Sequence, residues 1–348
     1  MLERTAKEQS RRQLTSFSSR RKIYRLSAKL ASLAVSGSAQ AGCDERECSM
    51  RYMVITMRSL ALSGLLLLFG CGGLSSRGTP TPPPNGTPQF GHVFLVVEEN
   101  HSYSDVIGNS QMPYLNNLAS QYGLATQYFA NIHPSLGNYF MLTTGLDTPS
   151  DDLFNGTVSA DNVVRELVKA GKSWKCYAEN LPSVGYTGND LVFYPYVKWH
   201  NPFAYFTDVT GTSEANNLVS FDQFKSDLAA GHLPNYSFIV PNMLDDAHDG
   251  PLAVADLWLR VNIDPLISNP VFQKDGLLVI LFDESDGNDT ANGGGHVAAV
   301  VVSAQAKKGF QSTTMYQHQS TLRLLLQGLG VTSLPGAAAS APSMGEFF

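Results

Sequence analysis

The chain has 348 residues, enough for one large domain or two small ones. Its formal net charge is −6 at pH 7, and 43% of its residues are hydrophobic. This mildly acidic balance, with no basic cluster beyond the N-terminus, argues against a nucleic acid as structural partner and is compatible with a soluble enzyme.

The first part of the chain carries the features of an export signal. Residues 1–49 are rich in Arg, Ser and Lys without a sustained apolar period, and we expect an unstructured extension or a wrongly assigned start. Translation would then begin at Met50, Met53 or Met57. Residues 50–71 place arginines before a short apolar run and a final cysteine, the pattern of a secretory signal that is too short to span a bilayer.

The end of that signal, Leu68-Phe69-Gly70-Cys71, resembles a bacterial lipobox. It favours a lipid anchor at Cys71 over an ordinary cleaved signal peptide. Residues 72–89, dense in Pro, Thr and Gly, are expected to be a linker. The sequence therefore predicts an exported protein of the cell envelope or periplasm that is anchored to the membrane through Cys71, or otherwise secreted.

Residues 90–348 are predicted to form the folded domain. Cys176 is its single cysteine, which excludes an internal disulfide. Apolar patterns predict strands at 92–97, 125–130, 173–178, 236–240, 276–282 and 297–303, and helices at 115–122, 160–170, 221–230, 253–267 and 316–329. This alternation predicts an α/β fold, a three-layer α/β/α sandwich with a mostly parallel central sheet.

A candidate nucleophile follows the second predicted strand. Pro134 disfavours helix at His133, so Ser135 falls at or near the N-cap of a helix that continues through the apolar run 136–142. The positive end of that helix favours an anion. Ser135 can simply cap the helix, or it can be a nucleophile beside a phosphate site. Acids and histidines at other strand ends favour the second interpretation.

Side chains with oxygen or imidazole donors follow three other predicted strands. In open α/β sheets the carboxyl ends of the strands hold the site, and oxygen and imidazole donors suit a divalent metal or proton transfer. Each group can also be a solvated loop, but their convergence favours a site. They are Glu99 with Asn100, Asp246 with His248, and Asp283 with Glu284.

The connection between the last two predicted strands is about a dozen residues and rich in Gly, Asn and Asp. It is too short for a normal parallel crossover, so we expect an antiparallel return that brings His296 close to Asp283 and Glu284. The roles of two further histidines stay open. His200 lies among aromatic residues and can be a packing residue, and His318 can be a helix-start residue or can reach the site.

Together these segments resemble the phosphoesterase family that contains bacterial acid phosphatases and phospholipases C, within the alkaline-phosphatase-like superfamily. The match runs in chain order through Glu99-Asn100-His101-Ser102, the His-Pro-Ser-Leu-Gly-Asn-Tyr run at 133–139, the Lys-Trp-His-Asn-Pro-Phe run at 198–203, residues 242–249, Asp283-Glu284 with His296, and His318-Gln319-Ser320. It covers about 90–329. Gly137 departs from the pattern, because many relatives carry proline there.

The resemblance implies an alkaline-phosphatase-like fold and one or more divalent metal ions. The implied metal ligands are Glu99, Asn100, Ser135, Asp283 and Glu284. The implied contacts to phosphate or leaving group are His133, His200, His248 and His296, and we expect Asn138 and Asp246 to be on the substrate side as well.

The expected reaction is hydrolysis of a phosphomonoester of the acid phosphatase type. Ser135 would form a phosphoserine, and His200 or His248 would protonate the leaving oxygen. Phospholipase C-type hydrolysis of a phosphodiester is the closest alternative, and a non-catalytic surface lipoprotein is the next. A sulfatase is disfavoured, because Gly137 and Tyr139 stand where sulfatases have Pro or Ala and Arg.

Overall fold

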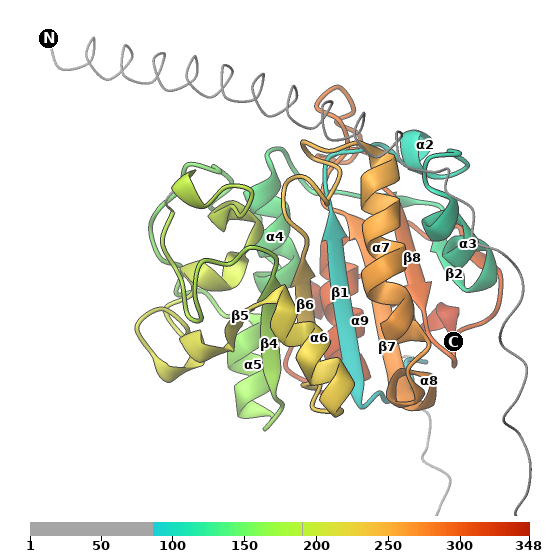
Figure 1. The fold of residues 1–348 in the computed structure, drawn as a ribbon. Coiled ribbons are helices and arrows are strands. Elements are labelled where there is room, and N and C mark those ends of the chain that lie inside the picture. The colour runs from blue at the N-terminus through green and yellow to red at the C-terminus, as the bar shows by residue number, and fades with distance from the viewer. Residues whose placement is uncertain (1–85, 190) are drawn as a thin grey trace, which may run out of the picture. The chain divides into compact units, whose positions relative to one another are not determined.

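The computed structural model describes residues 86–189 and 191–348, and Figure 1 shows their arrangement. The predicted extension and signal segment, and the linker up to residue 85, lie outside the described residues, so those predictions stay predictions. Within the described ranges, no helix combines the length and the apolar character needed to cross a bilayer.

An eight-stranded sheet forms the middle layer of the domain. Strand β8 runs antiparallel to both of its neighbours, and the other neighbouring pairs are parallel, so the predicted α/β class with a mostly parallel sheet is confirmed. In spatial order the strands are β5 (Leu218–Ser220), β4 (Trp174–Ala178), β6 (Tyr236–Val240), β1 (His92–Glu98), β7 (Gly276–Phe282), β8 (Ala299–Val302), β2 (Gly123–Ala125) and β9 (Phe310–Ser312).

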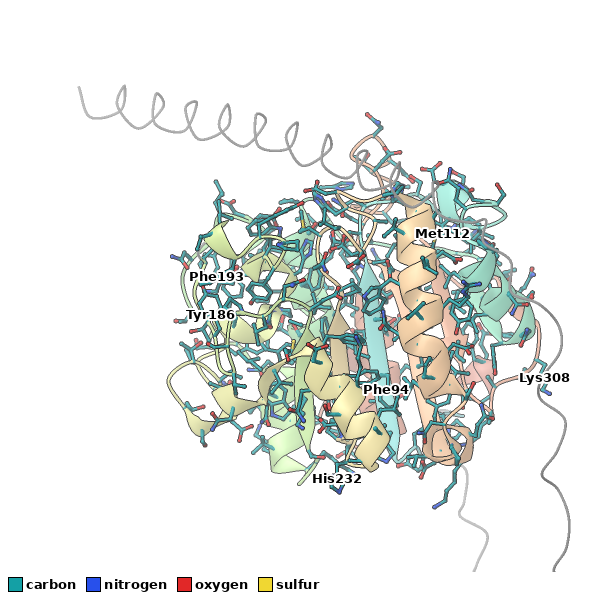
Figure 2. All side chains as sticks on the ribbon, in the orientation of Figure 1. Phe94, Met112, Tyr186, Phe193, His232 and Lys308 are labelled. Atoms are coloured by element: carbon teal, nitrogen blue, oxygen red, sulfur yellow. The ribbon has the colours of Figure 1, made fainter. Side chains whose placement is uncertain are left out.

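The central strands are apolar on both faces because helices cover the sheet on both sides. Every residue of β7 is buried, and so is every residue of β1 after His92. Phe94, labelled near the middle of the sheet in Figure 2, packs against Phe224 of α6 and Phe272 of α8, with ring centroids 6.5 and 5.9 Å away. This burial fixes where the strands end.

Helices form the two outer layers. In Figure 1 the nearer face is covered by α6 (Phe221–Ala230), α7 (Leu252–Ile267) and α8 (Pro270–Asp275), with α3 (Pro113–Gln121) beside α7. The far face is covered by α4 (Ser135–Thr144), α5 (Val163–Lys169) and α9 (His318–Gly328). The smaller elements are α2 (Tyr103–Val106), the paired strands β3 (Tyr128–Phe129) and β10 (Tyr316–Gln317), and the 3₁₀ turns Leu191–Phe193, Lys198–His200, Pro202–Tyr205, Ser213–Asn217, Gly336–Ala339 and Gly345–Phe347.

Two element predictions need correction. The single strand predicted at 125–130 is wrong, since the chain forms β2, which pairs with β8 and β9, and then β3, which pairs with β10. The helix predicted at 160–170 begins only at Val163, because the Asn162 side chain accepts a hydrogen bond from Arg165 N and caps it there. The antiparallel return of β8 onto β7 is confirmed. Strands β5, β9 and β10 were not predicted, because they are too short to show a period.

Candidate functional site

Three neighbouring strands deliver carboxylates to one edge of the sheet, the upper edge in Figure 1. Glu99 follows β1, Asp246 lies in the loop after β6, and Asp283 follows β7. Backbone hydrogen bonds from Glu99 N to Asp246 O (2.8 Å) and from Asp283 N to Glu98 O (3.0 Å) continue the pairing beyond the strands. All three side chains are buried. The convergence that was expected from the strand ends is therefore present in space.

Ser135 lies at the first residue of α4 and does not cap it. The N-cap is Pro134, whose own side chain makes no capping hydrogen bond. The Ser135 hydroxyl instead donates toward Glu99 Oε2 at 3.2 Å and Glu284 Oε1 at 3.4 Å. The next backbone N–H, of Leu136, donates to Asp152 Oδ1 at 2.9 Å. The hydroxyl is thus held among carboxylates at the positive end of a helix.

The donors around Ser135 fit a divalent cation. Asp283 Oδ2 is buried and has no hydrogen-bond partner in the described part of the chain. With its nitrogen turned inward, the Asn100 amide donates to Asp283 Oδ1 at 3.0 Å and Glu99 Oε2 at 2.5 Å. With its oxygen turned inward, the same amide joins the two carboxylates as a ligand. Converging carboxylate, amide and hydroxyl oxygens are the ligands that hard cations prefer.

A second group of donors shares Glu99. Three potential ligand atoms lie within 4.8 Å of one another, one each from Glu99, His200 and Asp246. All three residues are buried. His200 Nε2 is 3.2 Å from Glu99 Oε1, and its Nδ1 is 3.4 Å from Asp246 Oδ2. Tyr139 donates its hydroxyl to Glu99 Oε1 at 2.5 Å, and its ring stacks on His200. The two oxygens of Glu99 therefore face different donors.

The electrostatics of this edge also favour a cation. Burial raises the pKa of Glu99 well above its ordinary value, and the neighbouring Asp283 and Asp246 raise it further. Burial likewise raises the pKa of Asp283 and of Asp246, and burial with Asp152 raises that of Glu284 to about 8. Buried like charges cannot all ionise unless a cation compensates them.

The predicted histidines differ in what their rings can do. Both nitrogens of His200 face carboxylates, and the side chain is only 1% exposed, which places it as a candidate ligand and not as the predicted proton donor to a leaving group. His133 Nδ1 is 2.9 Å from Glu284 Oε2 and its Nε2 is 2.9 Å from Asp289 O, so both are engaged. His248 is 22% exposed. Among the described residues no hydrogen bond engages its Nε2, while its Nδ1 faces Asp249.

Asn138 was expected to donate to a phosphoryl oxygen, but its amide fixes the turn before Ser135. Its oxygen accepts from Asn131 N at 2.9 Å and Ile132 N at 3.2 Å, and its nitrogen donates to Ile132 O at 2.6 Å. The remaining contact of that nitrogen is Glu284 Oε2 at 3.5 Å. Asn138 therefore shapes the nucleophile turn.

His296 was expected beside Asp283 and Glu284, and the structure places its ring elsewhere. The chain does return there, but the ring lies between Tyr103 and Phe129, with centroids 4.3 and 4.9 Å away, and its Nε2 is 3.0 Å from Thr126 O. Aromatic neighbours and a carbonyl thus satisfy the imidazole outside the carboxylate cluster.

His318 supports the site from behind. It is fully buried, with Nε2 2.6 Å from Asp283 O and Nδ1 3.1 Å from the Tyr128 hydroxyl. Because the carbonyl can only accept, Nε2 carries the proton and Nδ1 accepts from Tyr128. Burial lowers the pKa of His318 to about 4, so the ring is neutral and fixes the backbone of Asp283.

Sequence reasoning missed Tyr139 as a site residue. Its hydroxyl contact to Glu99 is among the shortest in the cluster. A signal was available, because Tyr139 is four residues after Ser135 and such residues share one face of a helix. Asp152 was missed as well, since it sits in an irregular loop that carries no periodic signal, whereas Asp249 lay within the matched run 242–249 but was given no role of its own.

The comparison with known families agrees with this site. The model of the Phosphoesterase family matches residues 109–332, more than half of the chain. The chain belongs to the Phosphoesterase family. The match includes Ser135, Asp283 and Glu284 and begins after Glu99 and Asn100. The family resemblance inferred from the sequence is thereby confirmed.

Similar proteins are phosphatases and a phospholipase C. A phosphatidylinositol-3-phosphatase of Mycobacterium tuberculosis is 32% identical over 299 residues, which cover 84% of this chain and 94% of that protein. An acid phosphatase of Aspergillus fumigatus is 32% identical over 70% of this chain, but this chain spans only 56% of its length. A non-hemolytic phospholipase C of Pseudomonas aeruginosa is 23% identical over 56% of this chain and 35% of its own length.

Solved structures share the fold. A protein of the alkaline phosphatase superfamily from Vibrio parahaemolyticus superposes with a TM-score of 0.53 at 11% identity, covering 71% of this chain and 68% of that one. The predicted alkaline-phosphatase-like α/β fold is confirmed. As a member of this family, the chain is a hydrolase that acts on phosphoric ester bonds, which sets aside the non-catalytic lipoprotein.

Proposed function

We propose that this chain is a metal-dependent phosphomonoesterase of the acid phosphatase type that forms a phosphoserine at Ser135. The carrying observation is the Ser135 hydroxyl, held at the start of α4 within 3.4 Å of both Glu99 and Glu284. A phosphoryl group bound to that oxygen would lie against the positive end of the helix. No other described serine combines these neighbours.

The residues that would hold the cation are Glu99, Asn100, Ser135, Asp283 and Glu284, with His200 and Asp246 on the other oxygen of Glu99. When bound, a divalent cation would neutralise charge on the phosphoryl oxygens and lower the pKa of the serine hydroxyl. Tyr139 keeps the shared carboxylate in place through its hydrogen bond.

The chain's own groups can carry the protons. The Ser135 hydroxyl gives its proton to Glu99 or Glu284, its two hydrogen-bond acceptors, as its oxygen bonds to phosphorus. The bond from phosphorus to the ester oxygen breaks, and that oxygen keeps the electron pair and takes a proton from His248 Nε2. Water then attacks phosphorus and gives a proton to His248, while the Ser135 oxygen leaves phosphorus with the electron pair and takes back the proton held by Glu99 or Glu284. Among the described residues no hydrogen bond engages Nε2 of the partly exposed His248, whereas both ring nitrogens of the buried His200 face carboxylates.

The relatives favour monoesters over diesters. The 32% identical relatives carry the names of phosphatases, whereas the phospholipase C is 23% identical over 35% of its own length. The name of the Mycobacterium tuberculosis relative makes a phosphorylated lipid headgroup a substrate to test. Phospholipase C-type diester hydrolysis is the second candidate, and parallel assays with p-nitrophenyl phosphate and phosphatidylcholine separate the two.

The nucleophile is tested by Ser135→Ala, with Ser237→Ala as the matched control. Ser237 is equally buried, and its hydroxyl has no partner among the described residues. Ser135→Ala should lower the rate on p-nitrophenyl phosphate by about 10²–10⁴-fold, and a chelator should abolish it reversibly. Near-full activity of Ser135→Ala would remove the nucleophile assignment.

We further propose that the protein is exported and held at the cell envelope by a lipid on Cys71. The support is the lipobox-like sequence and the Pro/Thr/Gly-rich stretch after it. Replacement of Cys71 by alanine should move the protein from the membrane fraction to the soluble fraction. If the wild type and the Cys71→Ala variant divide in the same way between the membrane and soluble fractions, the anchor is contradicted.

A further inference from the structure

A tyrosine from the long segment between β4 and β5 contacts the loop that carries His248. The Tyr194 hydroxyl donates to Asp249 Oδ2 at 2.9 Å, and Asp249 Oδ1 lies 3.2 Å from His248 Nδ1. A backbone hydrogen bond from Met243 N to Pro195 O, at 3.1 Å, ties the same two segments together. The three side chains form a row that ends at His248 Nε2.

The acceptor chemistry of Asp249 fixes the state of the imidazole. An ionised carboxylate can only accept, so Nδ1 of His248 must carry a proton to bond with it. The exchangeable proton then belongs to Nε2, the nitrogen on the other side of the ring. The Tyr194 hydroxyl occupies the second oxygen of Asp249 and holds the carboxylate in one orientation. The main chain of His248 is fixed separately, by its N–H donating to Asp246 Oδ1 at 2.8 Å.

The segment that carries Tyr194 is itself supported by aromatic packing. Tyr186 and Phe193 lie together on this segment in Figure 2 and meet edge-to-face with centroids 5.3 Å apart. Tyr186 also packs on Tyr196 at 6.1 Å. These contacts hold together the chain on either side of Tyr194, which supports the position of a group that orients a catalytic side chain.

We propose that Asp249 and Tyr194 are positioning residues that hold His248 with Nε2 ready to protonate the leaving oxygen. This inference rests on the proposed function. In the step concerned, the ester oxygen leaves phosphorus with the bonding electron pair as Ser135 Oγ bonds to phosphorus. The leaving oxygen takes the Nε2 proton, and His248 remains as a neutral imidazole whose Nδ1–H still bonds to Asp249. The bond from Nδ1–H to Asp249 thus keeps the ring in one orientation throughout the transfer.

The dependence of rate on leaving group tests the proposal. Dinitrophenol leaves phosphorus without help from an acid, whereas phenol and alkyl alcohols need a proton. We compare kcat/KM, which reports the steps through phosphorylation of Ser135, for dinitrophenyl, p-nitrophenyl, phenyl and alkyl phosphates. Asp249→Asn should lower kcat/KM by about 10²-fold or more for the phenyl and alkyl esters and by less than about threefold for the dinitrophenyl ester. Tyr194→Phe should show the same trend at about three- to tenfold.

Asp245→Asn is the matched control, because it removes a carboxylate from the same loop that bonds to Asn242 and not to His248. Its leaving-group dependence should equal that of the wild type. A loss for Asp249→Asn that is uniform across the esters means a merely structural role and overturns the proposal. If Asp249→Asn does not fold, Tyr194→Phe decides by the same comparison. The proposed function is tested separately. If the wild type turns over the esters and Ser135→Ala does not, the proposed function holds even where this inference fails.

Discussion

Removal of the Tyr139 hydroxyl should weaken the binding of a divalent cation far more than it weakens the fold. Tyr139 and Glu99 are both fully buried, and the hydroxyl donates to Glu99 Oε1 at 2.5 Å. Burial and the adjacent Glu99 raise the pKa of Tyr139, so it remains a donor. In the metal-free protein burial raises the pKa of Glu99, which favours the neutral carboxyl, and a neutral carboxyl depends less on a hydrogen-bond donor. Once Glu99 is ionised to bind a cation, its carboxylate needs the hydrogen-bond donor that Tyr139 supplies.

The size of the effect follows from the charge on Glu99. A hydrogen bond to a charged group contributes about 1.5–3 kcal/mol. Its loss in Tyr139→Phe should therefore raise the dissociation constant for the cation by about 10- to 150-fold. Without metal, Tyr139→Phe should lose only the contribution of a hydrogen bond between neutral groups, which is about 0.5–1.5 kcal/mol of unfolding free energy.

Isothermal titration of chelator-treated protein measures the first quantity, and urea unfolding measures the second. Tyr236→Phe is the matched control, since that hydroxyl is equally buried and has no partner in the described part of the chain. It should bind the cation like the wild type. If Tyr139→Phe binds the cation within twofold of Tyr236→Phe, the reasoning about Glu99 is refuted.

Two further predictions follow from burial and packing. Burial raises the pKa of Glu99 and its neighbours in the folded state, so the metal-free fold loses stability as pH rises from their unfolded values of about 4 toward the raised folded values. Because a cation binds the ionised carboxylates, the gain in thermal midpoint on adding a divalent cation should grow from about pH 5 to about pH 8. An equal gain at both pH values would contradict this. Gly137→Ala would bring a Cβ within 2.6 Å of Ile132 Cγ2. It should lower the unfolding free energy by about 1–3 kcal/mol in urea, whereas Gly287→Ala, with open space around it, should change it by less than about 0.5 kcal/mol.

The packing around Gly137 also explains why glycine stands at this position, where the sequence departs from the pattern of the family. A side chain there would meet Ile132 and the carbonyl of Asp147, so glycine lets the turn of residues 146–150 approach α4 closely. A proline at this place would need that turn to lie elsewhere. The position of the turn is a tertiary fact, and no local pattern predicts it.

The sequence by itself determined the α/β layers and the carboxylates at the strand ends. The apolar runs of β1, β6 and β7 are long enough to read as buried strands, and acids follow them directly. Glu99, Asp246 and Asp283 could be assigned to one edge because parallel strands end together. Ser135 was found because a proline and an apolar run mark the start of its helix.

Only the tertiary structure decided which ring nitrogen of each histidine is available. His296 follows the predicted return of the chain and still turns its ring toward Tyr103 and Phe129, while Nε2 of His248 has no hydrogen bond among the described residues. Tyr194 reaches Asp249 from a segment more than fifty residues earlier. The direction of a side chain is set by packing against residues distant in the sequence, so spacing along the chain cannot reveal it.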